Sequence, residues 1–243
     1  MWLLALAIAP GIAISLYIYV KDQYNREPHL NLIVSFILGM LSTIPAIIFQ
    51  LALTPQIEKF FPKTDVTYTL ILSFLVVAVS EEYSKFFMLR YYAYPKKSFD
   101  EPFDGIVYGV IVSMGFATLE NIGYVFEHGV GTGIIRMFLS VPAHASFGAL
   151  MGYYVGKAKF NAARKEILLF KGFLTAVFFH GAFDCALLLQ DNKLVTHYIS
   201  QGMLLLIAIA VFIIAFRMAR LAIREHENIS RNQNQSFHND PFS

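Results

Sequence analysis

Long apolar runs, separated by short polar stretches, dominate the chain. Seven of these runs approach the ~20 residues that an α-helix needs to cross about 30 Å of hydrocarbon. The predicted spans are 3–20, 30–53, 67–92, 104–126, 134–156, 167–189 and 197–218. The pattern predicts an all-α fold, a polytopic transmembrane helical bundle. The first, second and seventh spans are expected to be scaffold, because the other four carry the polar groups.

The loops between the predicted spans differ in charge. The first, third and fifth loops and the C-terminal tail hold thirteen lysines and arginines, whereas the second, fourth and sixth loops hold four. By the positive-inside rule we expect the N-terminus outside and the C-terminus in the cytoplasm. No basic residue precedes the first apolar run, so it is expected to be a retained span and not a cleaved signal peptide.

Composition agrees with a protein embedded in a lipid bilayer. The chain is 56% hydrophobic and 15% charged, whereas a soluble domain has about 25% charged residues. The net charge is +2 and the basic residues lie in loops, so no nucleic-acid partner is expected. The single cysteine, Cys185, excludes an internal disulfide.

Two polar stretches outside the spans carry expectations of their own. Residues 221–243 are rich in Asn, Gln and Ser, and we expect a disordered, polar cytoplasmic tail after a membrane domain of residues 1–220. Residues 127–133 alternate glycine with other residues. They are expected to form a flexible loop, with a lid over an outward-facing site as the alternative.

The third span contains two adjacent acids and a lysine, Glu81, Glu82 and Lys85. A charge at the centre of a transmembrane helix costs about 2.5–3.5 kcal/mol on insertion scales, so such residues are functional candidates. Neighbours on a helix point about 100° apart, and Lys85 can pair with either glutamate. We expect one glutamate to pair with Lys85 and the other to face a cavity. The spacing does not say which.

Three further spans carry polar groups at depth, namely Glu120 and Asn121, His144, and His180 with Asp184. His180 and Asp184 share one helix face, so the carboxylate can orient the imidazole. Straight, perpendicular helices would place Glu120 nearer the outer surface than Glu81. Misplaced span ends, tilted helices or a role for Glu120 at a substrate entrance are all open.

Water held by carboxylates and imidazoles can act as a nucleophile. In one version, zinc bound by histidine and glutamate activates the water. In the other, a desolvated glutamate takes the proton and a nearby donor stabilises the oxyanion. Intramembrane acids also form proton relays, so a proton- or ion-coupled transporter is an alternative, although no internal repeat favours it. A non-catalytic membrane scaffold is a third reading.

Four motifs resemble, in order and spacing, those of the PrsW family of intramembrane proteases: Glu81-Glu82-x-x-Lys85, Phe116-x-x-x-Glu120, His144 and His180-x-x-x-Asp184. Other stretches are similar to PrsW of Gram-positive bacilli: Ala9-Pro-Gly, Lys21-Asp-Gln-Tyr, Asp104-Gly-Ile-Val-Tyr-Gly109, Gly115-Phe-Ala-Thr-Leu-Glu-Asn121 and Gly156-Lys-Ala-Lys-Phe160. The resemblance covers roughly residues 5–220.

The resemblance implies a multi-pass protease in the cell membrane of a Gram-positive bacterium. Its implied partner is a single-pass, membrane-anchored anti-sigma factor, in which it makes the site-1 cut. A site-2 protease then acts on the product, and an extracytoplasmic-function sigma factor is released in a stress response. A metalloprotease of this kind implies zinc as cofactor, with His144, His180 and Glu81 as ligands.

The family is distantly related to the CAAX-processing and bacteriocin-immunity proteases, which have Glu-Glu-x-x-x-Arg and Phe-x-x-x-His motifs. This chain departs from them at two positions. Lys85 stands one residue earlier than the arginine of their first motif, and Glu120 stands where their second motif has histidine. By analogy, Glu81 is the expected base and Glu82 the partner of Lys85. The expected catalytic residues are Glu81, Glu82, Glu120, His144, His180 and Asp184, with Lys85, Phe116 and Asn121 in support.

Overall fold

The computed structural model describes residues 2–238, and every element within this range is helical. Seven helical segments are long and apolar enough to cross a membrane: Trp2–Lys21, His29–Phe60, Val66–Ala93, Pro102–His128, Val130–Lys159, Ala162–Asp191 and Gln201–Asn232. Each overlaps one predicted span. The expected all-α, polytopic fold is therefore confirmed.

Several of these spans are made of more than one helix. The first and fourth are the continuous helices α1 (Trp2–Lys21) and α6 (Pro102–His128). The second is α2 (His29–Leu41) and α3 (Thr43–Phe60), and the fifth is α7 (Val130–Phe138) and α8 (Ser140–Lys159). The third is α4 (Val66–Ile71) and α5 (Val79–Met88), with π-helical segments at Leu72–Ala78 and Leu89–Ala93. The sixth is α9 (Lys165–Leu188), and the short α10 (Lys193–Thr196) leads to α11 (Gln201–His238).

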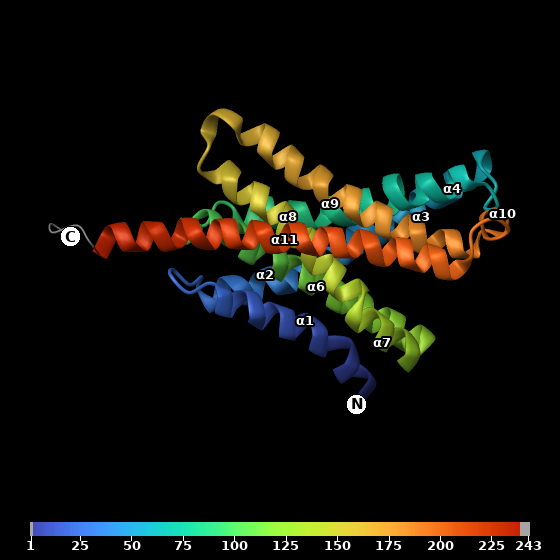
Figure 1. Ribbon diagram of the computed structural model, residues 1–243, viewed down its shortest axis with the longest axis horizontal. Helices are drawn as coiled ribbons and strands as arrows, with labels where there is room; N and C mark the ends of the chain where they lie inside the picture. Colours follow the sequence, from blue (N-terminus) through green and yellow to red (C-terminus); the bar gives the residue numbers. More distant parts are fainter. Residues whose placement is uncertain (1, 239–243) are drawn as a thin grey trace.

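Helix α6 is the centre of the bundle. Every residue from Pro102 to Thr118 is buried, and the helix packs against α1, α2 and α8. Figure 1 shows α1, α6 and α7 running obliquely to the long α11. The central position of α6 explains how one helix can carry residues that meet partners from several others.

Glycines let α6 and α8 approach closely. A Cβ atom on Gly105 would lie 2.4 Å from the carbonyl oxygen of Gly152, and one on Gly109 would lie 2.4 Å from that of Gly148. Small residues at such a crossing bring two backbones together, which is how transmembrane helices associate without a hydrophobic driving force. The small-residue face of α8 is therefore a packing surface for α6.

This packing makes Gly105→Ala a destabilising substitution. The added methyl group would displace backbone atoms of α8, and overpacking of this kind costs about 1–3 kcal/mol. Thermal unfolding in detergent measures the loss. Gly123→Ala on the same helix is the matched control, since nothing lies within 4 Å of a Cβ atom there. Equal melting temperatures for the two variants would contradict the close crossing.

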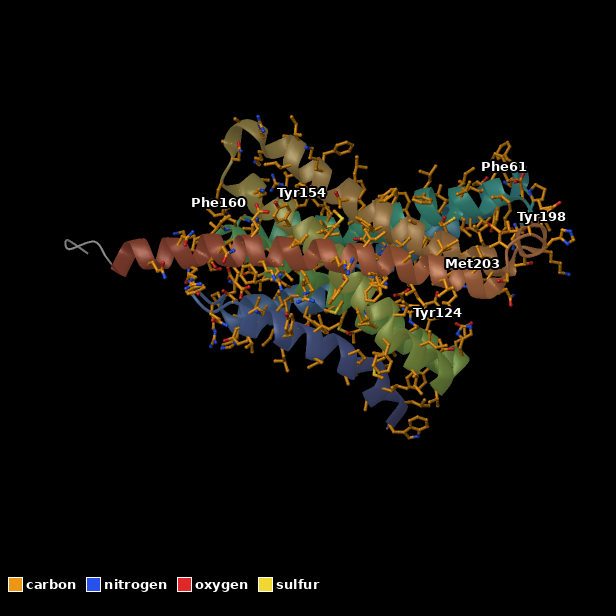
Figure 2. All side chains as sticks on the ribbon, viewed as in Figure 1. Phe61, Tyr124, Tyr154, Phe160, Tyr198 and Met203 are labelled. Carbon is orange, nitrogen blue, oxygen red and sulfur yellow. The ribbon has the colours of Figure 1, made fainter. Side chains whose placement is uncertain are left out.

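Exposed apolar side chains cover the outside of the bundle. Leu75, Phe178 and Leu206 are 62%, 59% and 59% exposed, as expected for side chains that face lipid. Figure 2 shows Phe160 near one end of the bundle and Tyr198 near the other. Tyrosine favours the membrane–water interface, so the position of Tyr198 agrees with a bundle that spans the bilayer.

The expected disordered tail is wrong for residues 221–238, because α11 continues as a helix to His238. Its buried positions Ala222, His226 and Ser230 recur every four residues, and Lys21 forms an ion pair with Glu227 at 3.2 Å. Small and polar residues make this contact face, so no apolar periodicity indicated it. Residues 239–243 of the predicted tail lie outside the described residues.

The expected flexible loop at residues 127–133 is also wrong. Helix α6 ends at His128 and α7 begins at Val130, so the connection is Gly129 alone. Gly129 has φ +81°, a conformation that glycine adopts readily. The single-residue turn sends α7 back toward α1, and it places Arg136 near the polar residues of α6.

Candidate active site

The polar residues of the spans meet at one cavity of about 740 Å³. Helices α3, α5, α6, α7, α8 and α9 all contribute to its lining. Tyr124 of α6, labelled in Figure 2, is among the residues that line it. The lining includes every residue of the expected catalytic set except Glu82: Glu81, Glu120, His144, His180 and Asp184.

The two adjacent glutamates have different surroundings. Glu82 is fully buried and accepts a hydrogen bond from Lys85 Nζ at 2.8 Å. Glu81 lines the cavity, lies 3.5 Å from Lys85 Nζ, and accepts a hydrogen bond from Gln50 at 3.2 Å. The structure thus answers the question left open by the spacing: Glu82 is the closer partner of Lys85, and Glu81 faces the cavity.

A π-helical segment comes directly before this pair. Leu72–Ala78 is π-helical, and α5 starts at Val79. A π-helix bonds residue i to i+5, so it changes the rotation of the following residues about the helix axis. π-Helical turns occur often at functional sites. The segment therefore helps to set the directions of the glutamates, which a regular α-helix through the whole span would not give.

His180 lies between carboxylates. Its Nδ1 atom is 2.7 Å from Glu82 Oε1, and its Nε2 atom is 3.1 Å from Asp184 Oδ2 and 3.7 Å from Glu81 Oε2. Two protonation states fit these contacts. An imidazolium donates to Glu82 and Asp184. A neutral ring that donates to Glu82 would turn the lone pair of Nε2 toward the oxygens of Asp184 and Glu81, which requires a proton or a metal ion between them.

His144 is held on both sides of its ring. Lys85 Nζ lies 3.3 Å from Nδ1, and Glu120 Oε2 lies 3.0 Å from Nε2. An ammonium group can only donate, so Nδ1 accepts from Lys85 and the Nε2–H group donates to Glu120. The rings of His144 and His180 are nearly perpendicular, with centroids 5.0 Å apart. Lys85 therefore links the acidic pair on α5 to the imidazole on α8.

Glu120 belongs to the same cluster as the other candidates. It contacts His144, and its Oε2 atom also accepts from Arg136 Nη2 at 2.7 Å. The observed ends of the third and fourth spans are within two residues of the predicted ends, so misplaced ends do not explain the depth difference. Oblique helices bring Glu120 and Glu81 to one cavity (Figure 1).

Two polar residues of the site were missed by sequence reasoning. Gln50 of α3 contacts Ser80 and Glu81, although its span was taken as scaffold. Arg136 was counted only as a loop residue, yet it pairs with Glu120 and donates to Asn121 Oδ1 at 3.0 Å. A polar residue inside an otherwise apolar span was the available signal for Gln50. No spacing rule connects Arg136 to Glu120 across the turn.

The supporting residues Phe116 and Asn121 also lie at the site. Lys85 Nζ lies 3.9 Å from the centre of the Phe116 ring, a cation–π contact. Asn121 Nδ2 donates to the main-chain oxygen of Ala7 at 2.9 Å, which ties α6 to α1. Phe116 therefore contacts the central lysine, whereas Asn121 positions Arg136 and the first helix.

The residues of the cavity fit the donor requirements of zinc. Ligand atoms of Glu81, His144 and His180 lie within 4.8 Å of one another, and Glu81 Oε2 has no hydrogen-bond partner among the described residues. Two imidazoles and a carboxylate are a common catalytic zinc set. Glu82 at His180 Nδ1 is the carboxylate that often orients a metal-binding histidine. At His144, a metal would compete with Lys85 or Glu120 for a ring nitrogen.

Comparison with known proteins agrees with these motifs. The family model "PrsW family intramembrane metalloprotease" matches residues 27–216. Protease PrsW of Geobacillus kaustophilus is 39% identical, covering 78% of this chain and 81% of the relative. Protease PrsW of Bacillus subtilis is 40% identical, covering 78% of this chain and 84% of the relative. No solved structure matches.

Both the family match and the relatives cover most of the chain, and the family match includes every helix that lines the cavity. They indicate a peptidase, and therefore favour neither the transporter nor the scaffold alternative. The seven membrane-spanning helices place the polar cluster inside a multi-pass protein. This chain belongs to the PrsW family of intramembrane metalloproteases.

Proposed function

We propose that this protease makes the first cut in a single-pass, membrane-anchored anti-sigma factor. A site-2 protease then cuts the shortened product, and an extracytoplasmic-function sigma factor is released in a stress response of a Gram-positive bacterium. The observation that carries the peptidase chemistry is the convergence of Glu81, His144 and His180 on one cavity within the bundle. The anti-sigma substrate is proposed from the resemblance of the motifs to the family.

The position of the cavity supports a cut near the outer face of the cell membrane. It lies between the second half of α6, the start of α8 and the end of α9. These helix ends adjoin the loops that are poor in lysine and arginine, which the positive-inside rule places outside. A single-pass substrate would then be cut on its extracytoplasmic side.

Glu81 is the proposed proton acceptor. Its Oε1 atom is held by Gln50. Its Oε2 atom has no hydrogen-bond partner among the described residues and lies 3.5 Å from Lys85 Nζ and 3.7 Å from His180 Nε2. A water molecule held by Glu81 and His180 would give its proton to Glu81 Oε2 as it attacks the peptide carbonyl, and Glu81 would pass that proton to the amine that leaves when the C–N bond breaks. A positioned acid or base of this kind contributes typically about 10²–10⁴-fold in rate.

His180 is proposed to support the transition state. Glu82 holds Nδ1 and Asp184 lies at Nε2, so the ring has a fixed orientation at the cavity wall. An Nε2–H group in this position can donate to the oxygen that becomes negative during attack, as oxyanion-binding groups do. His144 lies beside His180, with ring centroids 5.0 Å apart, and Lys85 and Arg136 hold His144 and Glu120 in place.

Zinc is the proposed cofactor, with Glu81, His144 and His180 as ligands. When bound there, zinc supplies a Lewis acid that activates water and polarises a carbonyl. In the alternative without metal, Glu81 alone accepts the proton. His180 Nε2 and Glu81 Oε2 would be metal ligands in the zinc version, whereas they act as hydrogen-bond donor and proton acceptor in the version without metal. Metal content separates the two versions.

The variant His180→Ala tests the proposal. We expect cleavage of a co-expressed, epitope-tagged anti-sigma factor to fall by about 10²–10⁴-fold, as for loss of an acid–base group. Elemental analysis of the purified proteins should find zinc in the wild type and much less in the variant. His197→Ala is the matched control, since His197 lies in an exposed turn outside the cavity.

Three results would contradict parts of this proposal. Full cleavage by a membrane-inserted His180→Ala protein would remove His180 from the site. Wild-type protein that is active without stoichiometric metal and in the presence of chelator would select the glutamate version. Cleavage of other single-pass proteins but of no anti-sigma factor would leave the peptidase and contradict the substrate.

A further inference from the structure

A second group of buried acids lies at the other end of the bundle from the cavity. Asp22 follows α1, Glu101 precedes α6, and Asp104 lies in the first turn of α6. Oxygen atoms of these three side chains lie within 4.8 Å of one another. Asp22 and Asp104 are fully buried, and Glu101 is 5% exposed. The motifs that contain Asp22 and Asp104 play no part in the proposed peptidase chemistry.

One oxygen of each carboxylate accepts a hydrogen bond from a backbone N–H group nearby in sequence. Asp104 Oδ2 accepts from the backbone N–H groups of Asp100 and Glu101 at 2.9 and 2.8 Å. The Glu101 side chain accepts from the backbone of Asp104, which completes a capping box at the start of α6. Asp22 Oδ2 accepts from the N–H group of Glu27 at 3.1 Å.

The other oxygen of each carboxylate has no hydrogen-bond donor among the described residues. Asp22 Oδ1, Glu101 Oε1 and Asp104 Oδ1 are buried without a hydrogen-bond partner among residues 2–238, and the same is true of Glu27 Oε1. The second Glu27 oxygen accepts from the Tyr108 hydroxyl. Buried polar atoms nearly always have partners, so an exception calls for an explanation, and a bound ion is one. The capping box and dipole of α6 do not account for Asp22 and Glu27, because both lie in the connection between α1 and α2.

Nearby cationic side chains do not neutralise this group. Arg26 Nε donates to the main-chain oxygen of Asp22 at 3.0 Å and not to its carboxylate. Lys159 Nζ donates to the main-chain oxygen of Tyr94 at 2.5 Å, and Lys21 pairs with Glu227. Among the described residues, no ion pair joins a lysine or arginine to Asp22, Glu27, Glu101 or Asp104.

Burial affects the acids that lie outside the spans, and at Asp22 the charge of Arg26 opposes it only in part. Desolvation raises the pKa of Asp22 to about 6. It also raises the pKa of Glu101 to about 7, against the opposing effect of the nearby Ser230 hydroxyl. Ionised carboxylates in this setting are costly unless a cation compensates them.

We propose that Asp22, Glu101 and Asp104 bind a divalent cation that prefers oxygen ligands, of the class of Mg²⁺, Mn²⁺ and Ca²⁺. The donor set contains only carboxylate oxygens, which these cations prefer. Ligands on opposite sides of one Ca²⁺ ion, at about 2.3–2.6 Å each, are at most about 5 Å apart, and the three acids meet this limit. The unpartnered oxygens supply the ligand atoms.

A cation here would join parts of the chain that are distant in sequence. Asp22 ends the first span, Glu101 and Asp104 begin α6, and Ser230 of α11 lies beside Glu101. Asp104 is sixteen residues before Glu120 on one helix, about 24 Å at 1.5 Å per residue. The cation site is thus separate from the candidate active site, and its existence does not depend on the proposed peptidase mechanism.

Binding of Mn²⁺ to the full-length protein in detergent micelles tests this site. The double variant His144→Ala/His180→Ala is the starting protein, so that imidazoles of the cavity bind no metal. Electron paramagnetic resonance should detect one bound Mn²⁺ per chain, and Mg²⁺ or Ca²⁺ should displace it. Asp104→Asn and Asp22→Asn should each weaken binding by at least about tenfold, since loss of even an indirect partner of a metal costs about 10–100-fold.

Glu225→Gln is the matched control, because Glu225 lies at the same end but is half exposed and pairs with Lys157. It should bind Mn²⁺ like the starting protein. The wild-type protein provides a second measurement that needs no variant at the site. Saturation at about 100 times the Kd should raise its melting temperature by about 5–10 °C.

Two outcomes would overturn the cation site. One is the absence of both Mn²⁺ binding and a rise in melting temperature, which would mean that protons alone neutralise the acids. The other is unchanged Mn²⁺ binding after both Asp22→Asn and Asp104→Asn, which would place the cation elsewhere.

Discussion

Glu81→Gln is expected to remove proteolytic activity while leaving the bundle folded. Glutamine has nearly the same shape and can still contact Gln50, but it cannot accept a proton or bind zinc as an anion. Loss of a positioned acid–base group lowers the rate by about 10²–10⁴-fold. Cleavage of a tagged single-pass substrate in membrane vesicles measures this loss, and the melting temperature in detergent shows that the fold persists.

The control for Glu81→Gln is Glu58→Gln on α3. Glu58 pairs with Lys63, whose side chain is 69% exposed, and it does not line the cavity. Its substitution should leave cleavage within a factor of about two. The zinc content of the Glu81→Gln protein then distinguishes two roles of Glu81. Retained zinc with lost activity indicates that Glu81 is a base, and lost zinc indicates that it is a ligand. Activity near the wild-type level in Glu81→Gln would exclude both roles.

Lys85→Met is expected to give the largest loss of stability. The lysine is 2% exposed and contacts Glu82, Glu81 and His144. Removing one partner of a buried ion pair costs about 3–5 kcal/mol, because the other charge stays buried without compensation. For a chain of this length the melting temperature should fall by about 6–20 °C.

A double-mutant cycle separates lost charge compensation from lost packing. Glu82→Gln/Lys85→Met removes the uncompensated carboxylate, so the double variant should melt above the single Lys85→Met variant. Lys63→Met is the control for a surface pair and should change the melting temperature little. A double variant that melts at the sum of the two single losses would show that Lys85 and Glu82 do not stabilise each other.

The candidate site shows where spacing rules succeed and where they stop. The i,i+3 relation of Glu82 and Lys85 and the i,i+4 relation of His180 and Asp184 were predicted, since both depend on one helix. The choice between Glu81 and Glu82 depends on the rotation of α5 relative to α3 and α9, and a π-helical segment contributes to it. The same limit applies to Glu120, because its pairing with His144 and Arg136 joins three helices.

The C-terminal helix and the second acidic group show a similar limit. Residues 221–238 look polar and irregular in sequence, but Ala222, His226 and Ser230 pack on one face of α11. Asp22 and Asp104 look like ordinary acids near loop ends, and only their shared burial shows that their oxygens lack donors. Contacts between small or polar residues of separate helices give no periodic signal, so composition could not predict them.

The sequence by itself determined the seven membrane-spanning helices, since length and apolarity decide whether a helix can cross a bilayer. It also determined the motifs that identify the family, because the order of charged residues inside apolar runs is rarely accidental. Analogy with the related proteases already assigned Glu82 to Lys85 and made Glu81 the expected base, and the tertiary structure shows Glu81 at the cavity. The tertiary structure alone decided that Gln50 and Arg136 join the site and that α11 extends past the predicted span. Helix tilt, rotation and close packing decide these features, and they arise only when the helices are assembled.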